Sequence, residues 1–495
     1  MQRRPRADPR TAARPDGPMP VAPHPELRRR MKERLDSIRS SANGDLGAFF
    51  NQLRIRDPVR HGLNDGVRIP ATAFAPGTSV RAMRRMATER LPLRGTIRLA
   101  VVLVDFDDRQ LTRRPSELDD VLFSIGRLEH GSVREYYREA SNGLVDIEGA
   151  LVGPYRLPRT LAEYAHGASG LGDDAPNART MARDAAIAAE GDLDLRAFDN
   201  DGDGIVDGLL IVHAGAEAAE TGRHGDLWAH KWTLAGDAVP VGGATAYAYA
   251  SVAENCRVGV CCHELGHLLF SWPDLHPPDG GSEGLGDWCV MASGSWNGEG
   301  EVPAHPSAWC KATQGWVTVL DLAADGVAEI PEVKDTATVA RLRSDGETGT
   351  EYFLAENRLR SGFDEALPGE GLLVYHVDES MEDNAGELNG LVGLLQADGR
   401  NDLESGAGRG DDGDPYPGSS DNRVLDETSN PSTRSFAGVP TGVSIRGISE
   451  PGPKAVVRVA VSSGAMVHLE LTDTAELVID GIVGSHTWEA LLEEI

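Results

Sequence analysis

The sequence predicts a mixed α/β unit over residues 96–315, followed by an all-β sandwich over residues 316–465. In the first region, runs of β-branched residues alternate with stretches of helical composition, which is typical of an α/β domain. After Thr318, short apolar runs are separated by Gly, Asp and Pro, which is typical of a sandwich. The chain has 495 residues, enough for about three domains of roughly 150 residues each.

The α/β unit is expected to begin with a buried strand at Ile97–Phe106, because this run is almost entirely apolar and rich in valine. An apolar helix that carries His263 is expected near its end. Between the two we expect helices at 132–140 and 178–190 and strands at 208–213 and 244–251.

The sandwich is predicted from three short β-rich runs, at 351–354, 371–377 and 456–461. Residues 400–435 are acidic and rich in Gly and Ser, so they are expected to form a long surface loop. No internal repeat of constant period is present.

Residues 1–95 are rich in Arg, Pro and Ala and contain no clear core strand. The stretch 25–40 has helical composition. We expect a basic, propeptide-like segment, because its charge is opposite to that of the remaining chain. No apolar core of a signal peptide follows Arg3 and Arg4, so these residues do not predict classical secretion.

The chain carries a formal net charge of −29, which disfavours nucleic acid as a partner because a polyanion would be repelled. An acidic surface suits calcium or a basic ligand, and plain solvation explains it equally well. No stretch reaches the about 18 uninterrupted apolar residues that a membrane span requires.

The five cysteines all lie between residues 256 and 310. An odd number in one short region is not a dispersed disulfide framework, and it allows at most two local bridges with one thiol left over. No CxxC pair is present, which disfavours a metal site made of cysteines.

A metal-binding motif, HExxH, occupies His263 to His267. On a helix, residues four apart share a face, so His263 and His267 can bind one zinc ion with Glu264 beside the open position. Zinc lowers the pKa of a bound water towards about 7, and Glu264 can then take a proton and pass it to a leaving amine. Burying these three side chains would be costly unless they coordinate something. The motif therefore predicts a zinc endopeptidase.

A catalytic zinc site needs a third protein ligand. Asp274 is the first choice, because Pro273 forces the chain out of helical geometry just before it. The alternative reading is that Asp274 caps or salt-bridges the turn. Other donors follow at His276, Asp279 and Glu283.

The segment Val260–Trp316 resembles the immune inhibitor A family of bacterial metallopeptidases. The matching pieces are CHELGH, PDL at 273–275, SEGLGDWCVMASGSWNG at 282–298 and PAHPSAWCKATQGW at 303–316. Further pieces match at 103–106, 198–215 and 351–379, so that the resemblance covers about residues 97–460.

This resemblance implies a metzincin-like catalytic domain followed by a β-sandwich, proteolysis of protein substrates, and an extracellular location. It implies that His263 and His267 bind zinc, that Glu264 is the general base and that Asp274 is the third ligand. Met291 would form the Met-turn, a tight turn that places a methionine beneath the metal.

One departure from the family concerns the turn after the second histidine. The commoner family form has Gly three residues after that histidine, with Pro-Asp soon after. Here Phe270 holds the Gly position, and the spacing to Asp274 is one residue longer. The departure affects the expected identity of the third ligand more than the expectation that zinc is bound.

A calcium site is predicted in the loop that precedes the strand at 208–213, because carboxylates alternate there around Gly-permitted turns. Leu210 stands at the twelfth position of the loop, so the loop is not a complete EF-hand. The candidate ligands are Asp199, Asp201, Asp203, the Ile205 carbonyl and Asp207. A weaker candidate site consists of Asp411, Asp412 and Asp414.

The C-terminal tail, 466–495, contains a stretch at Val478–Trp488 that resembles the DGIxGxxTW loop of small peptidoglycan-binding domains. Cell-wall binding is therefore an alternative function. A catalytically silent, calcium-binding relative is another, although the intact Glu264 argues against it.

Overall fold

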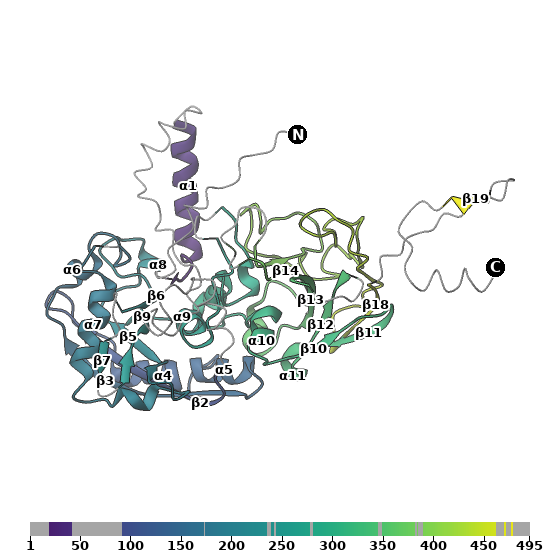
Figure 1. Cartoon of the computed structure of the whole chain (residues 1–495). Helices are drawn as coiled ribbons and strands as arrows, with labels where there is room; N and C mark the ends of the chain where they lie inside the picture. Colours follow the sequence, from purple (N-terminus) through teal and green to yellow (C-terminus); the bar gives the residue numbers. More distant parts are fainter. Residues whose placement is uncertain are drawn as a thin grey trace.

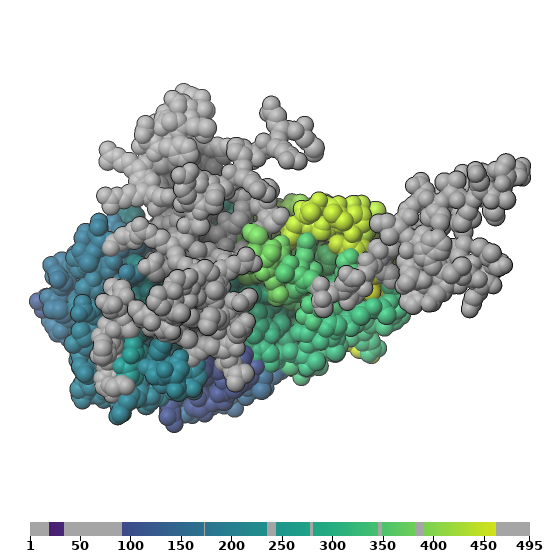
Figure 2. Space-filling view, in the orientation of Figure 1, coloured from purple at the N-terminus to yellow at the C-terminus, as the bar shows by residue number. Residues whose placement is uncertain are grey.

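The computed structural model describes residues 19–41, 92–172, 174–234, 239–241, 244–277, 281–344, 349–381, 384, 390–461, 470–471 and 477–478. Figure 1 shows an α/β part in blue and teal beside a β part in green and yellow-green. On the face drawn in Figure 2, the two parts meet directly at the lower edge. None of the described helices is long and apolar enough to cross a membrane. The peptidoglycan-like loop of the tail lies outside the described residues, apart from Val478.

The α/β part contains a six-stranded sheet in the order β1-β6-β9-β5-β2-β3. The four strands from β9 to β3 run parallel, whereas β6 runs antiparallel to β9, and β1 runs antiparallel to β6. The strands are β1 Met19–Pro20, β2 Gly95–Asp105, β3 Val145–Arg156, β5 Leu209–His213, β6 His230–Thr233 and β9 Ala248–Ala253.

Helices cover both faces of this sheet, as buried parallel strands require. Alternate residues of β2 point to opposite faces. Leu99, Val101 and Leu103 pack with α4, α5 and α9, whereas Ala100 and Val102 pack with α6 and α7. The helices are α4 Pro115–Phe123, α5 Val133–Ala140, α6 Leu161–Ala165, α7 Ala178–Ala189, α8 Ala218–Thr221 and α9 Val258–Phe270.

The helices expected in this part and the strand expected at 97–106 are present within two residues of their predicted bounds. The single strand expected at 244–251 is wrong. Residues Ala244–Ala246 (β8) pair with β4 (Ile205–Val206) and β7 (Val239–Val241) in a small separate sheet, and β9 begins at Ala248 in the main sheet. The alternating small residues continue across Tyr247, so their pattern does not reveal the change of sheet.

The β part contains two sheets, in the orders β10-β12-β13-β14-β15 and β11-β18-β17-β16. Apolar residues of both sheets, including Phe353, Val374 and Val457, form one core between them. The runs expected at 351–354 and 371–377 lie on β13 and β14, and the run expected at 456–461 lies on β18 except for its last residue. The bounds are β10 Thr318–Asp321, β11 Gly326–Pro331, β12 Thr338–Leu342, β13 Glu351–Arg358, β14 Gly371–Asp378, β15 Val392–Leu394, β16 Val424–Leu425, β17 Ser444–Arg446 and β18 Lys454–Ala460.

The other face of the five-stranded sheet packs against the α/β part. Leu354, Tyr375 and Val392 belong to the same buried cluster as Trp272 and Trp288. The expected boundary at 315/316 therefore falls within one continuous core, beside the short helices α10 (Ala308–Thr313) and α11 (Val333–Thr336).

Candidate metal centre

The HExxH motif lies on α9, all of whose residues are buried. His263 and His267 are held in orientation by main-chain carbonyls, since His263 Nδ1 lies 2.8 Å from Val290 O and His267 Nδ1 lies 2.6 Å from Trp272 O. A carbonyl can only accept a hydrogen bond, so each Nδ1 carries the proton and each Nε2 keeps its lone pair. The two Nε2 atoms are 3.0 Å apart. This arrangement is typical of histidines that bind a metal.

Asp274 and His276 bring two more donors to the same point. Asp274 Oδ1 lies 3.1 Å from His263 Nε2, 3.3 Å from His267 Nε2 and 3.1 Å from His276 Nε2. Ligands at zinc distances in a tetrahedron would be about 3.3 Å apart. His263, Asp274 and His276 also offer ligand atoms that all lie within 4.8 Å of one another.

The hydrogen bonding of these donors fits a metal. Asp274 Oδ1 and His276 Nε2 are buried but have no hydrogen-bond partner of acceptable geometry, although they lie so close together. A cation between them would satisfy lone pairs that converge in this way. Burial alone would raise the pKa of Asp274, but the His276 and His267 imidazoles lower it well below its usual range. Asp274 therefore favours the ionised form, which is the form that binds a metal ion.

The turn that delivers Asp274 differs from the expected one. Helix α9 ends at Phe270, and Ser271 adopts a left-handed conformation with φ 55°. The Ser271 N–H bonds back to the carbonyls of Gly266 and His267. Ser271 therefore makes the turn, and Pro273 follows it rather than ending the helix. Of the other candidate ligands, Asp279 lies outside the described residues.

Glu283 forms a salt bridge with Arg28, with Arg28 Nε 2.9 Å from Glu283 Oε1. Glu283 therefore faces the N-terminal helix α1 (Pro25–Ser41).

The Glu264 carboxyl is fully buried, and neither of its oxygens has a hydrogen-bond partner of good geometry among the described residues. Burial raises the pKa of Glu264 well above its usual value, and the nearby carboxylates of Asp274 and Glu217 raise it further. A carboxyl with a raised pKa is a stronger base, which suits a group that accepts and returns a proton.

Met291 packs against α9 between the two histidines. A Cβ atom placed on Gly266 would lie only 2.6 Å from Met291 Sδ, so glycine is needed for this contact. Leu275 N donates to Met291 O at 2.8 Å, which ties the methionine to the chain beside Asp274.

An extended N-terminal segment lies along the edge of the main sheet. Met19 and Pro20 pair with Lys231 and His230 of β6, and β1 also lies against α9. The Val21 N–H donates to Ala229 O at 3.1 Å. The sequence contained no signal for this strand, which is only two residues long and contains a proline.

Two indole groups bind the carbonyls that follow β1. Trp228 Nε1 donates to Val21 O, and Trp296 Nε1 donates to Ala22 O, both at 2.8 Å. The Val21 N–H also lies close enough to Glu264 to lower the pKa of that carboxyl. The segment therefore passes directly over the candidate general base.

The predicted calcium loop brings together Asp199, Asp201 and Asp207, whose ligand atoms lie within 4.8 Å of one another. The Asp199 carboxylate also accepts hydrogen bonds from the N–H groups of Gly202, Asp203 and Gly204, at 2.8, 3.1 and 2.8 Å. Gly202 and Gly204 have φ 79° and 88°, a conformation that favours glycine.

The other two candidate ligands, Asp203 and Ile205, are linked by a hydrogen bond, which Ile205 N donates to Asp203 Oδ1 at 2.8 Å. In the weaker candidate site, the Asp414 carboxylate accepts hydrogen bonds from Trp288 Nε1 at 2.8 Å and from Asp411 N at 3.1 Å.

All five cysteines are buried and unbridged. The thiol of Cys256 is hydrogen-bonded to that of Cys261, and the thiol of Cys289 to that of Cys310. Cys262 is the thiol left over from these two pairs.

Residues 119–318 match the family model described as the catalytic domain of the immune inhibitor A peptidase M6 family. This part of the chain is therefore similar to a metallopeptidase catalytic domain. Immune inhibitor A of Bacillus thuringiensis subsp. alesti is 32% identical over 208 residues, 35% of this chain and 30% of that protein. The pre-pro-metalloprotease PrtV of Vibrio cholerae serotype O1 is 29% identical over 270 residues, 44% of this chain and 29% of that protein.

The aligned segments thus cover less than a third of these relatives. The matched range contains every donor of the candidate metal centre, because residues 263–276 lie inside it.

Proposed function

We propose that this chain is a zinc-dependent endopeptidase that hydrolyses peptide bonds in protein substrates. The observation that carries this proposal is the convergence of two histidines and a carboxylate, with ligand atoms 3.0 to 3.3 Å apart, beside a buried glutamate. The match to a peptidase family supports it independently.

His263, His267 and Asp274 would hold the ion, and zinc, when bound, supplies Lewis acidity to a water molecule. Glu264 takes the proton of the attacking water and returns it to the amine of the leaving group. Because the site is buried, this transfer takes place in a low-dielectric environment, where the charged groups interact strongly.

The test is cleavage of a denatured protein substrate by the purified chain, with and without residues 1–90. A zinc chelator should abolish cleavage, and added zinc should restore it. Cleavage that persists in chelator would overturn the proposal. A chain that binds zinc but cleaves nothing in either form would favour the catalytically silent alternative.

We further propose that the N-terminal segment is an inhibitory propeptide. Its support is the extended path of Met19 to Ala22 over Glu264, which resembles a peptide added to the edge of a sheet. Arg28 attaches the following helix through Glu283 and the Ser282 carbonyl. The prefix of the Vibrio relative's name, pre-pro, supports both a propeptide and an extracellular location.

Calcium binding by the loop at 199–207 is proposed as a structural role. Its support is the convergence of Asp199, Asp201 and Asp207 ahead of β5, where a bound cation would offset the repulsion of three carboxylates. Hard oxygen donors of this kind suit calcium better than zinc.

A further inference from the structure

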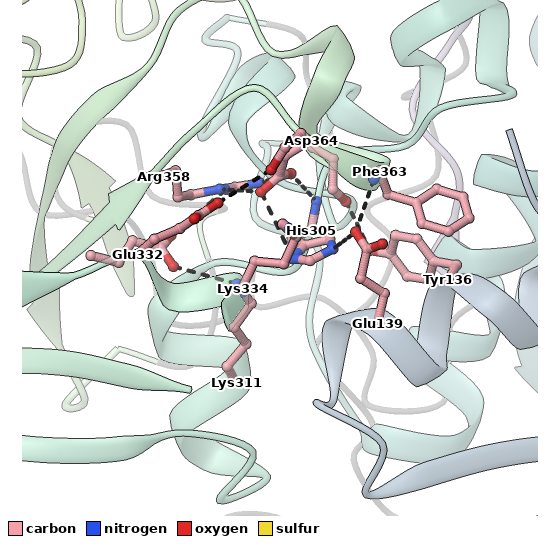
Figure 3. Close-up of polar contacts among 12 residues, drawn as sticks. Tyr136, Glu139, His305, Lys311, Glu332, Lys334, Arg358, Phe363 and Asp364 are labelled. Atoms are coloured by element: carbon pink, nitrogen blue, oxygen red, sulfur yellow. Dashed lines mark hydrogen bonds and ion pairs between the residues drawn. The ribbon is translucent and has the colours of Figure 1, made fainter. Parts of the chain in front are cut away.

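A buried ion-pair network links the β part to the α/β part. Arg358, the last residue of β13, is fully buried. Its guanidinium is bound in a fork to Asp364, with Nε 2.8 Å from Asp364 Oδ2 and Nη2 on Asp364 Oδ1. The remaining terminal nitrogen, Nη1, donates to Trp288 O at 2.7 Å. Figure 3 shows Arg358 and Asp364 facing His305, with Glu139 on the far side of His305.

The carboxylate partner of Arg358 is itself fixed from the α/β part. His305 N donates to Asp364 Oδ1 at 2.9 Å, and His305 Nε2 lies 3.0 Å from Glu139 Oε1 on α5. Phe363 N donates to the same Glu139 oxygen at 2.9 Å. Burial would raise the pKa of Asp364, but the charge of Arg358 lowers it well below its usual value. Arg358 and Asp364 are therefore a charged pair with fixed geometry.

Trp288 is the residue through which this network reaches the metal centre. It stands two residues before Val290, whose carbonyl orients His263, and three before Met291, which packs under α9. Trp288 is also bound to the β part through its indole, which donates to Asp414.

The chain on both sides of Trp288 has further anchors in the β part. Asp287 N donates to Arg409 O at 2.7 Å, and Glu283 N donates to Leu403 O at 2.8 Å. The segment from 283 to 288 is thus hydrogen-bonded to residues of the β part that lie more than a hundred positions later in the chain.

We propose that Arg358 is a positioning residue for the metal centre, acting through the main chain of Trp288 on the orientation of His263. The β part is accordingly a component of the scaffold of that centre. This inference rests on the proposed function, because it concerns the zinc site. Groups that orient metal ligands from outside typically change metal affinity about 10- to 100-fold when they are removed.

The variant that tests this proposal is Arg358→Lys, which keeps the charge but loses the planar fork that serves Asp364 and Trp288 together. The matched control is Arg341→Lys on β12. Arg341 also forms a fork with an aspartate, at 2.6 and 2.7 Å from the two oxygens of Asp321, but this pair is partly exposed and has no contact with the Trp288 segment.

Two measurements report on the centre without requiring turnover: zinc affinity by competition with a chelator, and the visible absorption spectrum of the Co²⁺-substituted protein. In Arg358→Lys we expect zinc affinity to fall about 10- to 100-fold and the cobalt bands to shift. Arg341→Lys should match the unaltered chain in both. Wild-type affinity and spectrum in a folded Arg358→Lys would overturn the proposal.

A second variant covers the case in which Arg358→Lys does not fold. An unpaired buried charge strongly destabilises a fold. The double variant Arg358→Gln with Asp364→Asn removes both charges of the pair and so leaves neither unpaired. It should also bind zinc more weakly, and wild-type affinity would again overturn the proposal. If the unaltered chain itself binds no zinc, the proposed function fails, whereas equal zinc binding in all variants contradicts only the role of Arg358.

Discussion

Ser271 shows how one extra residue is accommodated after the second histidine. Helix α9 continues to Phe270, Ser271 makes the left-handed turn, and the Asp274 carboxylate lies 3.1 and 3.3 Å from the two histidine nitrogens. A left-handed serine costs more than a left-handed glycine, and its main-chain N–H satisfies carbonyls at the end of α9 as glycine would.

The third ligand can be tested at Asp274. Asp274→Ala should lower zinc affinity by one to two orders of magnitude, about 1.4 to 2.8 kcal/mol, because it removes the only charged donor. His276→Ala and Glu283→Ala should keep stoichiometric zinc when metal content is measured after dialysis. Full zinc in Asp274→Ala together with an empty His276→Ala would transfer the assignment to His276.

The individual residues were predictable to different degrees. His263, Glu264 and His267 could be predicted because helical spacing alone places them together. The proximity of His276 to Asp274 depends on the turn conformations after Ser271, which no local pattern determines. No sequence pattern indicated Arg358, because its proposed role depends on a contact with a segment 70 residues earlier in the chain.

At the level of single elements, the N-terminal helix was predicted at 25–40 and found at Pro25–Ser41, whereas the strand before it was missed. Helical composition is a local property. The strand forms by pairing with β6, which would otherwise be the edge of the main sheet, and that edge exists only in the folded sheet.

Inhibition by this segment predicts a specific effect of Arg28. Arg28→Ala should increase the rate of cleavage of a peptide substrate, because it removes the salt bridge to Glu283 and the bond to Ser282 O. Arg29→Ala is the control, since among the described residues Arg29 pairs with Glu26 and Glu33 of its own exposed helix face and with no other acidic group. Equal rates in both variants, with no increase after removal of residues 1–90, would contradict inhibition.

The loop at 199–207 makes a prediction about stability. Saturating calcium should raise the melting temperature of the chain, since a ligand at 100 times its Kd contributes about 2.7 kcal/mol. Asp201→Ala and Asp203→Ala should lose this response. Asp194→Ala, an exposed residue that pairs with Arg196 beside the loop, should keep it. A calcium response that is absent from the unaltered chain would reject the site.

For the whole molecule, the order of an α/β part and a β part was predictable from the change in composition near Thr318. The continuity of the core across that point was not predictable. Leu354 and Tyr375 belong to an alternating apolar pattern, and this pattern shows that one face of the sheet is buried but not which part of the chain covers it. Strands β3 and β6 were also missed. β6 has only four residues, and one of them is the buried Lys231.

The central claim is that Glu264 transfers protons beside a zinc ion, and one paired measurement on Glu264→Ala tests it most directly. The variant should retain one zinc per chain, because Glu264 is not among the converging ligands, and should lose all but a few per cent of its proteolytic rate. Both quantities are measured on the same purified sample, after removal of residues 1–90. A zinc-loaded variant that still cleaves at more than a few per cent of the unaltered rate would contradict the account.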